Sequence, residues 1–468
     1  MTSTTTSHGP PSSATGDIGV GLVSVGWMGK LHSRAYQALP WVYPELGLRP
    51  RLVHAADTAA DRVAYATEVL GYARGSSDYR QVLADPEVEV VSICAPNLLH
   101  RELGVAAAEA GKHLWIEKPV GRGAQETAQV AAAARAAGVL TSIGFNYRHV
   151  PAVEHVRELV ASGALGRITN VRGVFFTGYA AEPKGALSWR FKRELAGSGA
   201  LGDLLSHVVD TMHYLVGPIV QVTALTSMVY GQRPILPMGS ATHFAVLEDG
   251  ELGPVDNEDY AAALVRFAAD AQGPGAVGTL EASRAIVGPQ CGFGFELYGT
   301  DGSAGWDFER MNELRLCLGR GRPHQGYTIV LNNAQLGDYG RFQPGPGIAM
   351  GFDDLKVIEA KKFLVAVTGG ERRNATIEDA HAVAEVLAAA ERSATNGTWH
   401  TVPAVPGATF GREPAPTRGG PGDRRGGPPE NRGGPGDRRG GPPVGAGRAP
   451  QPPQAGAVVS TLAGWASS

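Results

Sequence analysis

The stretch GLVSVGWMGKLHSRAY, residues 21–36, decides the fold. It has the spacing of a dinucleotide-binding turn, Gly-x-Gly-x-x-Gly, but Ser24 stands where the first glycine is expected, and Gly26 and Gly29 fill the other positions. In this motif the glycines permit a tight turn, a close approach to pyrophosphate, and close packing of the next helix on the strand. Gly26 and Gly29 keep the second and third roles. We therefore predict that the small Ser24 takes the tight turn and that the motif still binds a dinucleotide.

The residues on either side of this turn predict which dinucleotide it binds. A helix predicted from Met28 to Leu39 aims its first N–H groups, around Trp27 and Met28, at a bound anion. Asp57 ends the second predicted strand, where a carboxylate accepts hydrogen bonds from a ribose and repels a 2′-phosphate. The insert 41–50 accounts for the long separation between Gly29 and Asp57. These features predict NAD as the cofactor, in preference to NADP.

Strand and helix patterns alternate through the first part of the chain, which predicts a doubly wound parallel sheet. The predicted strands are 18–25, 51–57, 88–96, 112–119 and 140–146, and the further helices are 59–70, 99–110 and 123–137. Ligands of such sheets bind at the carboxyl ends of the strands. The segments 24–29, 96–100, 117–119 and 146–148, together with Asp57, all fall at those ends.

After Pro151 the pattern changes to longer alternating runs bounded by turn residues, which predicts a mainly antiparallel sheet in a second domain. The runs are 168–179, 220–231, 261–269, 275–286 and 292–302, and the predicted helices are 199–217, 353–368 and 377–394. The fold class is therefore α/β, with a Rossmann domain over 17–147 and an open-faced α/β domain over 148–403.

Both ends of the chain differ in composition from this folded part. Residues 1–16 are rich in Ser, Thr, Pro and Gly, and residues 404–468 are rich in Gly, Pro and Arg, with RGGPGDRRGGPP occurring at 418–429 and again at 432–443. Such segments bury too little apolar surface to offset their ordering entropy, so we predict that both are disordered. The tail is interpreted as a solvated extension, with weak RNA binding through charge and stacking as the alternative.

The bulk composition excludes several classes of protein. The 468 residues carry a formal net charge of −3, which argues against a dedicated nucleic-acid or membrane-surface protein. The three cysteines match no metal-binding spacing, so they are read as reduced thiols. No secretory signal or membrane-spanning run is recognised, and the chain is expected to be cytoplasmic.

Two motifs carry side chains suited to proton chemistry. Lys118, in the Glu-Lys-Pro stretch 117–119, closes a predicted strand and would lie in the cleft. Asp203 and His207 lie four residues apart on the predicted helix 199–217 and so share one face, which Asp210 and Tyr214 extend. Histidine takes up a proton near neutral pH, and a nearby carboxylate orients it. A metal site is not predicted, since no further His or Cys cluster accompanies the pair; a purely structural polar face remains the alternative.

Together these motifs resemble the Gfo/Idh/MocA family of NAD(P)-dependent oxidoreductases. The resemblance covers roughly residues 18–400. Within the family, the sequence is most similar to the branch of levoglucosan dehydrogenases, glycoside 3-dehydrogenases and inositol dehydrogenases. Ser24 is its one departure from the family's turn. The matching stretches are GLVSVGWMGKLHSRAY, CAPNLLH, AAEAGKHLWIEKPV, GFNYRHVPAV and SWRFKRELAGSGALGDLLSHVVDTMHYLVG.

The resemblance implies roles for individual residues. Lys118, Asp203 and His207 occupy the positions of the family's catalytic residues and are expected to contact substrate. Cofactor contacts are implied for Ser24, Gly26, Trp27, Met28, Asp57, Pro96, Asn97, His100, Glu117, Lys118, Trp189 and Arg190. Substrate or nicotinamide contacts are implied for Asn146, Tyr147 and Arg148.

These expectations describe an NAD-dependent dehydrogenase that oxidises a secondary hydroxyl of a cyclic sugar, glycoside or inositol, with C3 of a hexose ring as the favoured position. The small-molecule substrate is expected to be the main partner, in a homo-oligomer of two or four copies without membrane contact. Two alternatives stay open. One is an enzyme that retains NAD and cleaves a glycoside by oxidation and elimination, and the other is a non-catalytic NAD-sensing regulator.

Overall fold

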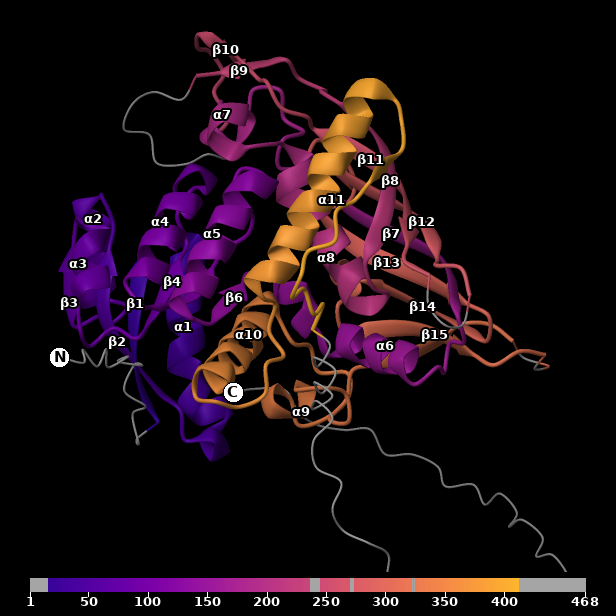
Figure 1. The fold of residues 1–468 in the computed structure, drawn as a ribbon, viewed down its shortest axis with the longest axis horizontal. Coiled ribbons are helices and arrows are strands. Elements are labelled where there is room, and N and C mark those ends of the chain that lie inside the picture. Colours follow the sequence, from indigo (N-terminus) through magenta and orange to yellow (C-terminus); the bar gives the residue numbers. More distant parts are fainter. Residues whose placement is uncertain (1–15, 236–244, 270–272, 322, 324, 412–468) are drawn as a thin grey trace, which may run out of the picture. The chain divides into compact units, whose positions relative to one another are not determined.

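A six-stranded parallel sheet forms the N-terminal part of the computed structural model, as predicted (Figure 1). Its strand order is β3-β2-β1-β4-β5-β6, so the chain winds outward on both sides of β1. This reversal creates a crevice at the carboxyl ends of β1 and β4, where open α/β sheets bind ligands. The strands are β1 (Asp17–Val23), β2 (Arg49–Ala56), β3 (Arg74–Ser76), β4 (Val90–Ile93), β5 (His113–Ile116) and β6 (Thr141–Ile143).

Helices connect these strands and cover the sheet. They are α1 (Trp27–Val42), α2 (Ala60–Glu68), α3 (Tyr79–Ala84), α4 (Asn97–Glu109) and α5 (Ala124–Ala137). The structure describes residues 16–235, 245–269, 273–321, 323 and 325–411. Within these residues no helix combines the length and apolar character needed to cross a membrane.

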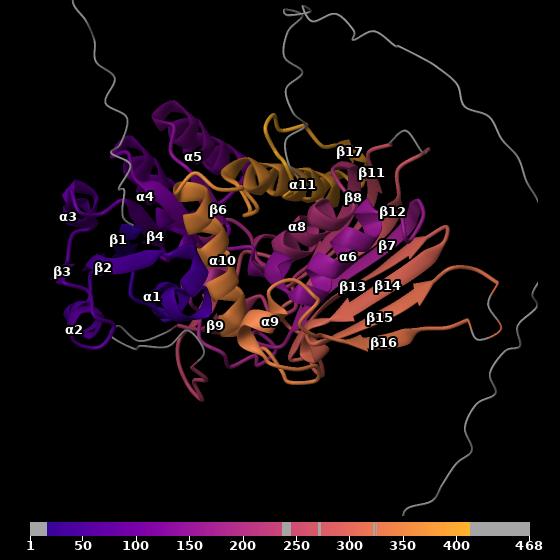
Figure 2. The same ribbon diagram turned by 90° about the horizontal axis from the view of Figure 1, so that it is seen from below.

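A nine-stranded sheet follows, with the order β16-β15-β14-β13-β7-β12-β11-β8-β17 (Figure 2). Its neighbours are antiparallel except β7 and β12, which run parallel, so the sheet is mainly antiparallel as predicted. Its strands are β7 (Ile168–Thr177), β8 (Ile219–Ser227), β11 (Tyr260–Phe267), β12 (Val277–Ser283), β13 (Cys291–Gly299), β14 (Gly302–Asp307), β15 (Glu313–Leu318), β16 (Thr328–Leu331) and β17 (His400–Thr401). A separate small hairpin pairs β9 (Gln232–Pro234) with β10 (Leu252–Pro254).

Two C-terminal helices connect the sheets. α10 (Phe352–Val367) packs against α1, and α11 (Ile377–Asn396) packs against both α5 and β8 (Figures 1 and 2). One apolar core accordingly runs through both layers, from Ile116 of β5 to Leu280 of β12. The boundary predicted at 147/148 falls within the 3-10 helix η2 (Asn146–His149), between α5 and the helix α6 (Pro151–Ala161), and it stays a prediction.

Several predicted elements need correction. The helix predicted over 199–217 is a π-helical turn, η4 (Leu201–Leu205), followed by α8 (Ser206–Leu215). The strand predicted over 88–96 is limited to β4, because its last residues form the turn into α4. The short elements β3, α3 and β14 to β16 were not predicted. Their runs of three to six residues are too short for a clear hydrophobic period.

The described chain continues beyond the predicted start of the disordered tail. Residues 404–411, here called the C-terminal strap, lie against the folded part. The N–H groups of Thr409 and Phe410 donate to Asp379 Oδ1 at 2.9 and 2.8 Å, and the Phe410 carbonyl accepts from Arg157 at 2.8 Å. The strap is therefore a correction to the tail predicted over 404–468. The remaining residues predicted to be disordered, 1–15 and 412–468, lie outside the described residues.

Candidate active site

The turn between β1 and α1 has the shape and the donors that a pyrophosphate requires. Ser24 adopts a left-handed conformation with φ of 75°, which glycine adopts freely and which costs other residues about 1–3 kcal/mol. A Cβ on Gly29 would lie 2.3 Å from the Ser24 carbonyl oxygen, so only glycine fits there. A Cβ on Gly26 would meet no atom within 4 Å, and no side chain caps the first turn of α1. Open space and uncapped N–H groups fit a dinucleotide phosphate.

Asp57 joins this turn to the end of β2. Its Oδ2 accepts from the N–H of Val25 at 2.8 Å, and its Oδ1 accepts from the N–H of Ala59 at 3.0 Å. Arg62 lies 3.7 Å from Oδ2 with a half-exposed side chain. The carboxylate is thus held beside the turn, as predicted, but it also supports the turn itself. Sequence reasoning missed this second role and missed Arg62.

Lys118 and Asp203 form a hydrogen-bonded ion pair where the two sheets meet. The ammonium of Lys118 donates to Asp203 Oδ1 at 2.9 Å and to the Asp203 carbonyl at 2.8 Å. The hydroxyl of Tyr179 donates to Oδ2 at 2.8 Å, and Arg190 lies 3.5 Å from Oδ1. Burial alone would raise the pKa of Asp203, but the charges of Lys118 and Arg190 and these hydrogen bonds hold it well below its usual range. Asp203 is therefore an ionised carboxylate between two cations.

His207 lies on the first turn of α8 in largely apolar surroundings. The rings of Phe145, Tyr147 and Phe175 have centroids 5.8, 4.9 and 5.8 Å from its imidazole. Burial lowers its pKa well below the usual value, the charge of Lys118 lowers it further, and Asp203 opposes them. The imidazole is therefore neutral at neutral pH and is able to accept a proton.

Asp203 and His207 do not lie on one continuous α-helix. Asp203 lies within η4, whereas His207 lies in α8, so the simple i, i+4 relation of an α-helix does not apply. Glu258 anchors the start of the turn, because its Oε1 accepts from the N–H groups of Gly199 and Leu201 at 2.7 and 2.9 Å. The turn that carries Asp203 is therefore supported by Glu258, which lies 59 residues after Gly199 and 57 residues after Leu201.

The segment 146–148 divides between the site and the interior. Asn146 is 3% exposed, and its side-chain Nδ2 has no hydrogen-bond partner in the part of the chain that the structure describes. Tyr147 packs edge-on against His207. Arg148 points elsewhere and is paired with Asp210 and Asp379, away from Lys118. The structure therefore places Tyr147 beside His207, it leaves the predicted contact of Asn146 a prediction, and it corrects the expectation that Arg148 contacts substrate.

The remaining predicted cofactor residues lie around the crevice, but several are occupied by structural contacts. Both ring nitrogens of His100 lie within hydrogen-bond distance of carbonyl oxygens, Nδ1 at 2.6 Å from that of Pro119 and Nε2 at 2.7 Å from that of Ala95, and a neutral imidazole donates to one of the two. Asn97 donates to the Ala196 carbonyl at 3.0 Å. Five others complete the predicted set. Pro96 occupies the N-cap position of α4, and the Glu117 carboxylate is turned inward to His32. The Trp189 ring centre lies 4.6 Å from the guanidinium of Arg190, and Trp27 is exposed and followed by Met28 in α1. The imidazole of His100 therefore ties two loops together and is not turned toward a cofactor.

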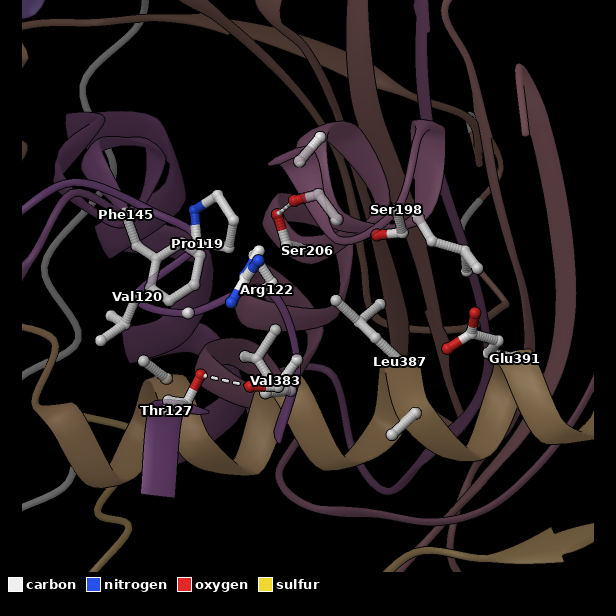
Figure 3. A pocket seen from close by; sticks show the side chains of 18 residues that line it. Pro119, Val120, Arg122, Thr127, Phe145, Ser198, Ser206, Val383, Leu387 and Glu391 are labelled. Carbon is white, nitrogen blue, oxygen red and sulfur yellow. Dashed lines mark hydrogen bonds between the residues drawn. The ribbon is translucent and has the colours of Figure 1, made fainter. Parts of the chain in front are cut away.

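A separate apolar pocket lies behind the π-helical turn (Figure 3). Pro119 and Phe145 line it on one side and Val383 and Leu387 of α11 on the other. Lys118, Asp203 and His207 are not among its lining residues. Within the described residues, no three His, Cys, Asp or Glu side chains cluster in a way that could hold a metal ion.

Besides Arg62, sequence reasoning missed two residues of the site, Tyr179 and Glu258. Tyr179 was visible only as the last residue of the predicted strand 168–179, a strand-end position of the kind that often faces a ligand, and β7 itself ends at Thr177. Glu258 gave no local signal, because its partners are backbone N–H groups far away in the sequence. Both contacts depend on the second sheet packing against the first.

Comparison with known proteins gives consistent matches over the described part. Residues 18–145 match the model "Oxidoreductase family, NAD-binding Rossmann fold", and residues 153–305 match "GFO/IDH/MocA C-terminal domain". Levoglucosan dehydrogenase of Pseudarthrobacter phenanthrenivorans is 36% identical over 83% of this chain and 99% of its own length. A structure of levoglucosan dehydrogenase in complex with NADH superimposes with a TM-score of 0.77, at 34% identity over 83% of this chain and 100% of that one. The scyllo-inositol 2-dehydrogenase (NAD(+)) of Bacillus subtilis is 25% identical over 74% of this chain and 87% of its own.

Proposed function

Because this chain belongs to the GFO/IDH/MocA family of NAD-binding oxidoreductases, we propose that it oxidises a secondary hydroxyl of a cyclic sugar, glycoside or inositol. One observation carries the proposal. An ionised Asp203 holds the Lys118 ammonium at 2.9 Å beside a neutral, buried His207. That set offers a base for the hydroxyl proton and a positive charge for the oxygen that loses it.

The residues of this chain divide the proton chemistry among them. His207 accepts the hydroxyl proton, which its neutral imidazole is suited to do. Lys118 stabilises the alkoxide oxygen electrostatically while the proton leaves. Asp203 holds the Lys118 ammonium in place, and Tyr179 and Arg190 hold Asp203. Bound NAD⁺ supplies the acceptor for the hydride that leaves the same carbon.

We assign the orientation of the substrate to Asn146 and Tyr147, which follow one another in η2. The unpaired, buried Nδ2 of Asn146 is a donor without a partner among the described residues, and a buried unpaired donor is costly unless a ligand satisfies it. A sugar hydroxyl is a suitable acceptor. Tyr147 packs edge-on against His207 and is buried, so its ring limits the space beside the proposed base.

The turn and Asp57 support NAD over NADP. A carboxylate beside the adenosine ribose accepts hydrogen bonds from its hydroxyls and repels a 2′-phosphate. The two backbone N–H bonds that Asp57 accepts keep this charge in position. We expect kcat/KM to be higher with NAD⁺ than with NADP⁺ in the same assay.

An assembly of identical chains is also part of the proposal. The exposed face of the second sheet carries apolar side chains that a monomer would leave in water: Leu225, Leu264, Val277, Ile329, Leu331 and Trp399. Extended apolar patches of this kind mark interaction surfaces. Light scattering on the purified chain should give a mass of two or four copies, and Leu264→Glu should lower that mass.

The proposed function is tested by incubating the purified chain with NAD⁺ or NADP⁺ and a panel of inositols, free hexoses, levoglucosan and aryl glycosides. Absorbance of the reduced nicotinamide and the mass of the product are measured together. Stoichiometric NADH and a product two hydrogens lighter support a dehydrogenase, and the position of the new carbonyl tests the expected hexose C3. Release of an aglycone without NADH would instead support oxidation with elimination. Binding of NAD without turnover of any sugar would support a sensor.

His207→Ala gives the sharpest test of the assigned base. Proton transfer by a positioned side chain contributes about 10²–10⁴-fold, so kcat should fall by that factor. The dissociation constant for NADH should change little, because the turn at Gly26 is untouched. Full activity in His207→Ala would show that another group takes the proton.

A further inference from the structure

A buried network of charged side chains lies directly behind Lys118. Glu117, its neighbour in the chain, accepts a hydrogen bond from His32 at 2.9 Å and from Lys356 at 2.6 Å, both on Oε1. Lys356 also pairs with Glu359 Oε2 at 2.9 Å. No side chain of the four is more than 10% exposed. The network joins α1, the end of β5 and α10, which lie far apart in the sequence.

The Glu117 carboxylate packs closely against Gly144. A Cβ on Gly144 would lie 2.4 Å from Glu117 Oε2, so the absence of a side chain there makes the room that the carboxylate fills. His32 is held in turn, because its Nδ1 lies 3.1 Å from the Ser92 hydroxyl and its ring stacks on Trp115 at 3.5 Å. Glu117 is thereby fixed from three sides, and the backbone that leads into Lys118 is fixed with it.

Stability alone does not account for such a network. A buried ion pair is often no more stabilising than well-packed apolar residues of the same volume, because two charges must be removed from water. Here Glu117 and Lys356 are both held in their charged forms. Burial by itself would raise the pKa of Glu117, but Lys356 and His32 hold it well below its usual range. Burial by itself would lower the pKa of Lys356, but Glu117 and Glu359 raise it above its usual range.

We propose that Lys356 is a positioning residue of the active site: by locking the Glu117 carboxylate it fixes the direction of Lys118, and with Glu117 it sets the electrostatic field at His207. This proposal rests on the proposed function, since it concerns the same proton transfer. Among the described residues, Lys356 forms its ion pairs with Glu117 and Glu359 and none with Asp203, so it acts on the site through Glu117 and through its charge.

The charges around His207 determine the direction in which each substitution should shift its pKa. The positive charges of Lys118 and Lys356 lower the pKa of His207, and the negative charges of Asp203 and Glu117 raise it, on top of the larger lowering by burial. The rings packed against the imidazole, those of Phe145, Tyr147, Phe175 and Phe293, carry no charge at neutral pH. Around Glu117 the titratable groups are His32 of α1, Lys356 and Glu359 of α10, Cys94 after β4 and His100 of α4.

His32 does not add a charge at neutral pH. Burial lowers its pKa to about 4, although the hydrogen bond to Glu117 opposes this. Removing Lys356 therefore removes one positive charge near His207, and removing the charge of Glu117 removes one negative charge. The two changes should move the pKa of His207 in opposite directions: upward for Lys356→Met and downward for Glu117→Gln.

The same helix provides a matched control. Lys362 of α10 pairs with Glu154 and lies 3.2 Å from His149 Nδ1, and its side chain is 9% exposed. It faces α6 and η2 and takes no part in the network behind Lys118. Lys362→Met thus breaks a buried lysine–glutamate pair in the same helix by the same substitution. Any general loss of stability is shared by the two variants, whereas a positioning effect is confined to Lys356→Met.

The experiment compares wild type, Lys356→Met, Lys356→Arg, Glu117→Gln and Lys362→Met in the full chain. We expect Lys356→Met to lower kcat on the sugar about 10- to 100-fold, as misplacement of a reacting group by about 1 Å does, with little change in NADH affinity measured by fluorescence. The acid limb of kcat/KM against pH should move to higher pH in Lys356→Met and to lower pH in Glu117→Gln. Lys356→Arg, which keeps the charge, should recover part of the loss and keep the wild-type limb.

The result that overturns the proposal is agreement between Lys356→Met and Lys362→Met in kcat and in pH profile. If Lys356→Met does not fold, Glu117→Gln still decides it, because an acid limb that does not move to lower pH in Glu117→Gln would refute the field at His207. A second measurement does not need turnover: the NMR titration of the His207 ring, identified by its loss in His207→Asn, should shift in the same opposite directions. If wild type oxidises no sugar, the proposed function fails, while this titration still supports or refutes the role of Lys356.

Discussion

Replacing Arg148 by methionine should destabilise the fold and should leave substrate binding unchanged. The guanidinium is 1% exposed and donates through Nε and Nη2 to Asp210 at 2.8 and 2.5 Å, and through Nη1 to Asp379 at 2.9 Å. Asp379 in turn accepts the N–H groups of Thr409 and Phe410 in the C-terminal strap. Arg148 therefore joins η2, α8, α11 and the strap.

The expected magnitude follows from these contacts. Methionine removes the charge and leaves Asp210 and Asp379, at 2% and 0% exposure, without their cation. Breaking a buried pair by removing one partner costs about 3–5 kcal/mol. At about 2–4 °C per kcal/mol, the melting temperature should fall by roughly 6–20 °C. Arg172→Met is the matched control, because its pair with Glu296 is largely exposed and should be worth under about 1 kcal/mol.

Thermal unfolding followed by circular dichroism, together with KM for the sugar, measures both quantities. Adding Asp210→Asn to Arg148→Met should recover part of the lost stability, because one of the two unpaired carboxylates is then neutral. If Arg148→Met melts together with Arg172→Met and raises KM, Arg148 binds substrate as the family resemblance implied. The structural role derived from its contacts would then be wrong.

Three further predictions concern the site and its supports. Truncation after Gly411 should leave thermal stability unchanged, whereas truncation after Pro403 should lower the melting temperature, because it removes the strap contacts to Asp379. Tyr179→Phe removes one of the donors to Asp203, at 2.8 Å, and should lower kcat by a few-fold with little change in NADH binding, as steady-state kinetics and fluorescence titration will measure. Gly199→Ala would put a Cβ 1.9 Å from the Glu258 carbonyl oxygen, so it should displace η4 and lower both kcat and the melting temperature; wild-type behaviour in both assays would contradict this packing.

Much of the NAD-binding domain could be predicted, because the motifs that indicate it are local in the sequence. The turn at 24–29 follows a short apolar strand and leads directly into a helix, and its small residues are adjacent in the sequence. The parallel sheet and the position of the crevice could therefore be predicted from short stretches of sequence. The conformation of Ser24 also explains the substitution: φ of 75° is accessible to serine at a moderate cost. The prediction of an NAD-binding Rossmann fold is confirmed by the family match over 18–145.

The catalytic half was less predictable because its geometry is built from distant residues. The prediction that Asp203 and His207 share one face assumed the i, i+4 spacing of an α-helix, but Asp203 lies in a π-helical turn whose start is anchored by Glu258. Tyr179 reaches Asp203 only because β7 lies under that turn.

The fold class, the order of the two sheets and the cofactor turn could be predicted from the sequence, because each depends on a continuous stretch with a period or a spacing. The roles of Lys118, Asp203 and His207 were predicted from the family resemblance that these stretches carry. Only the tertiary structure decided which polar side chains face the site and which are buried as anchors. Arg148 and Glu117 were themselves predicted to contact substrate and cofactor, yet their side chains are paired in the interior with Asp210 and Lys356. A buried charge must find its partner wherever packing supplies one, and that partner lies 62 residues away for Arg148 and 239 residues away for Glu117.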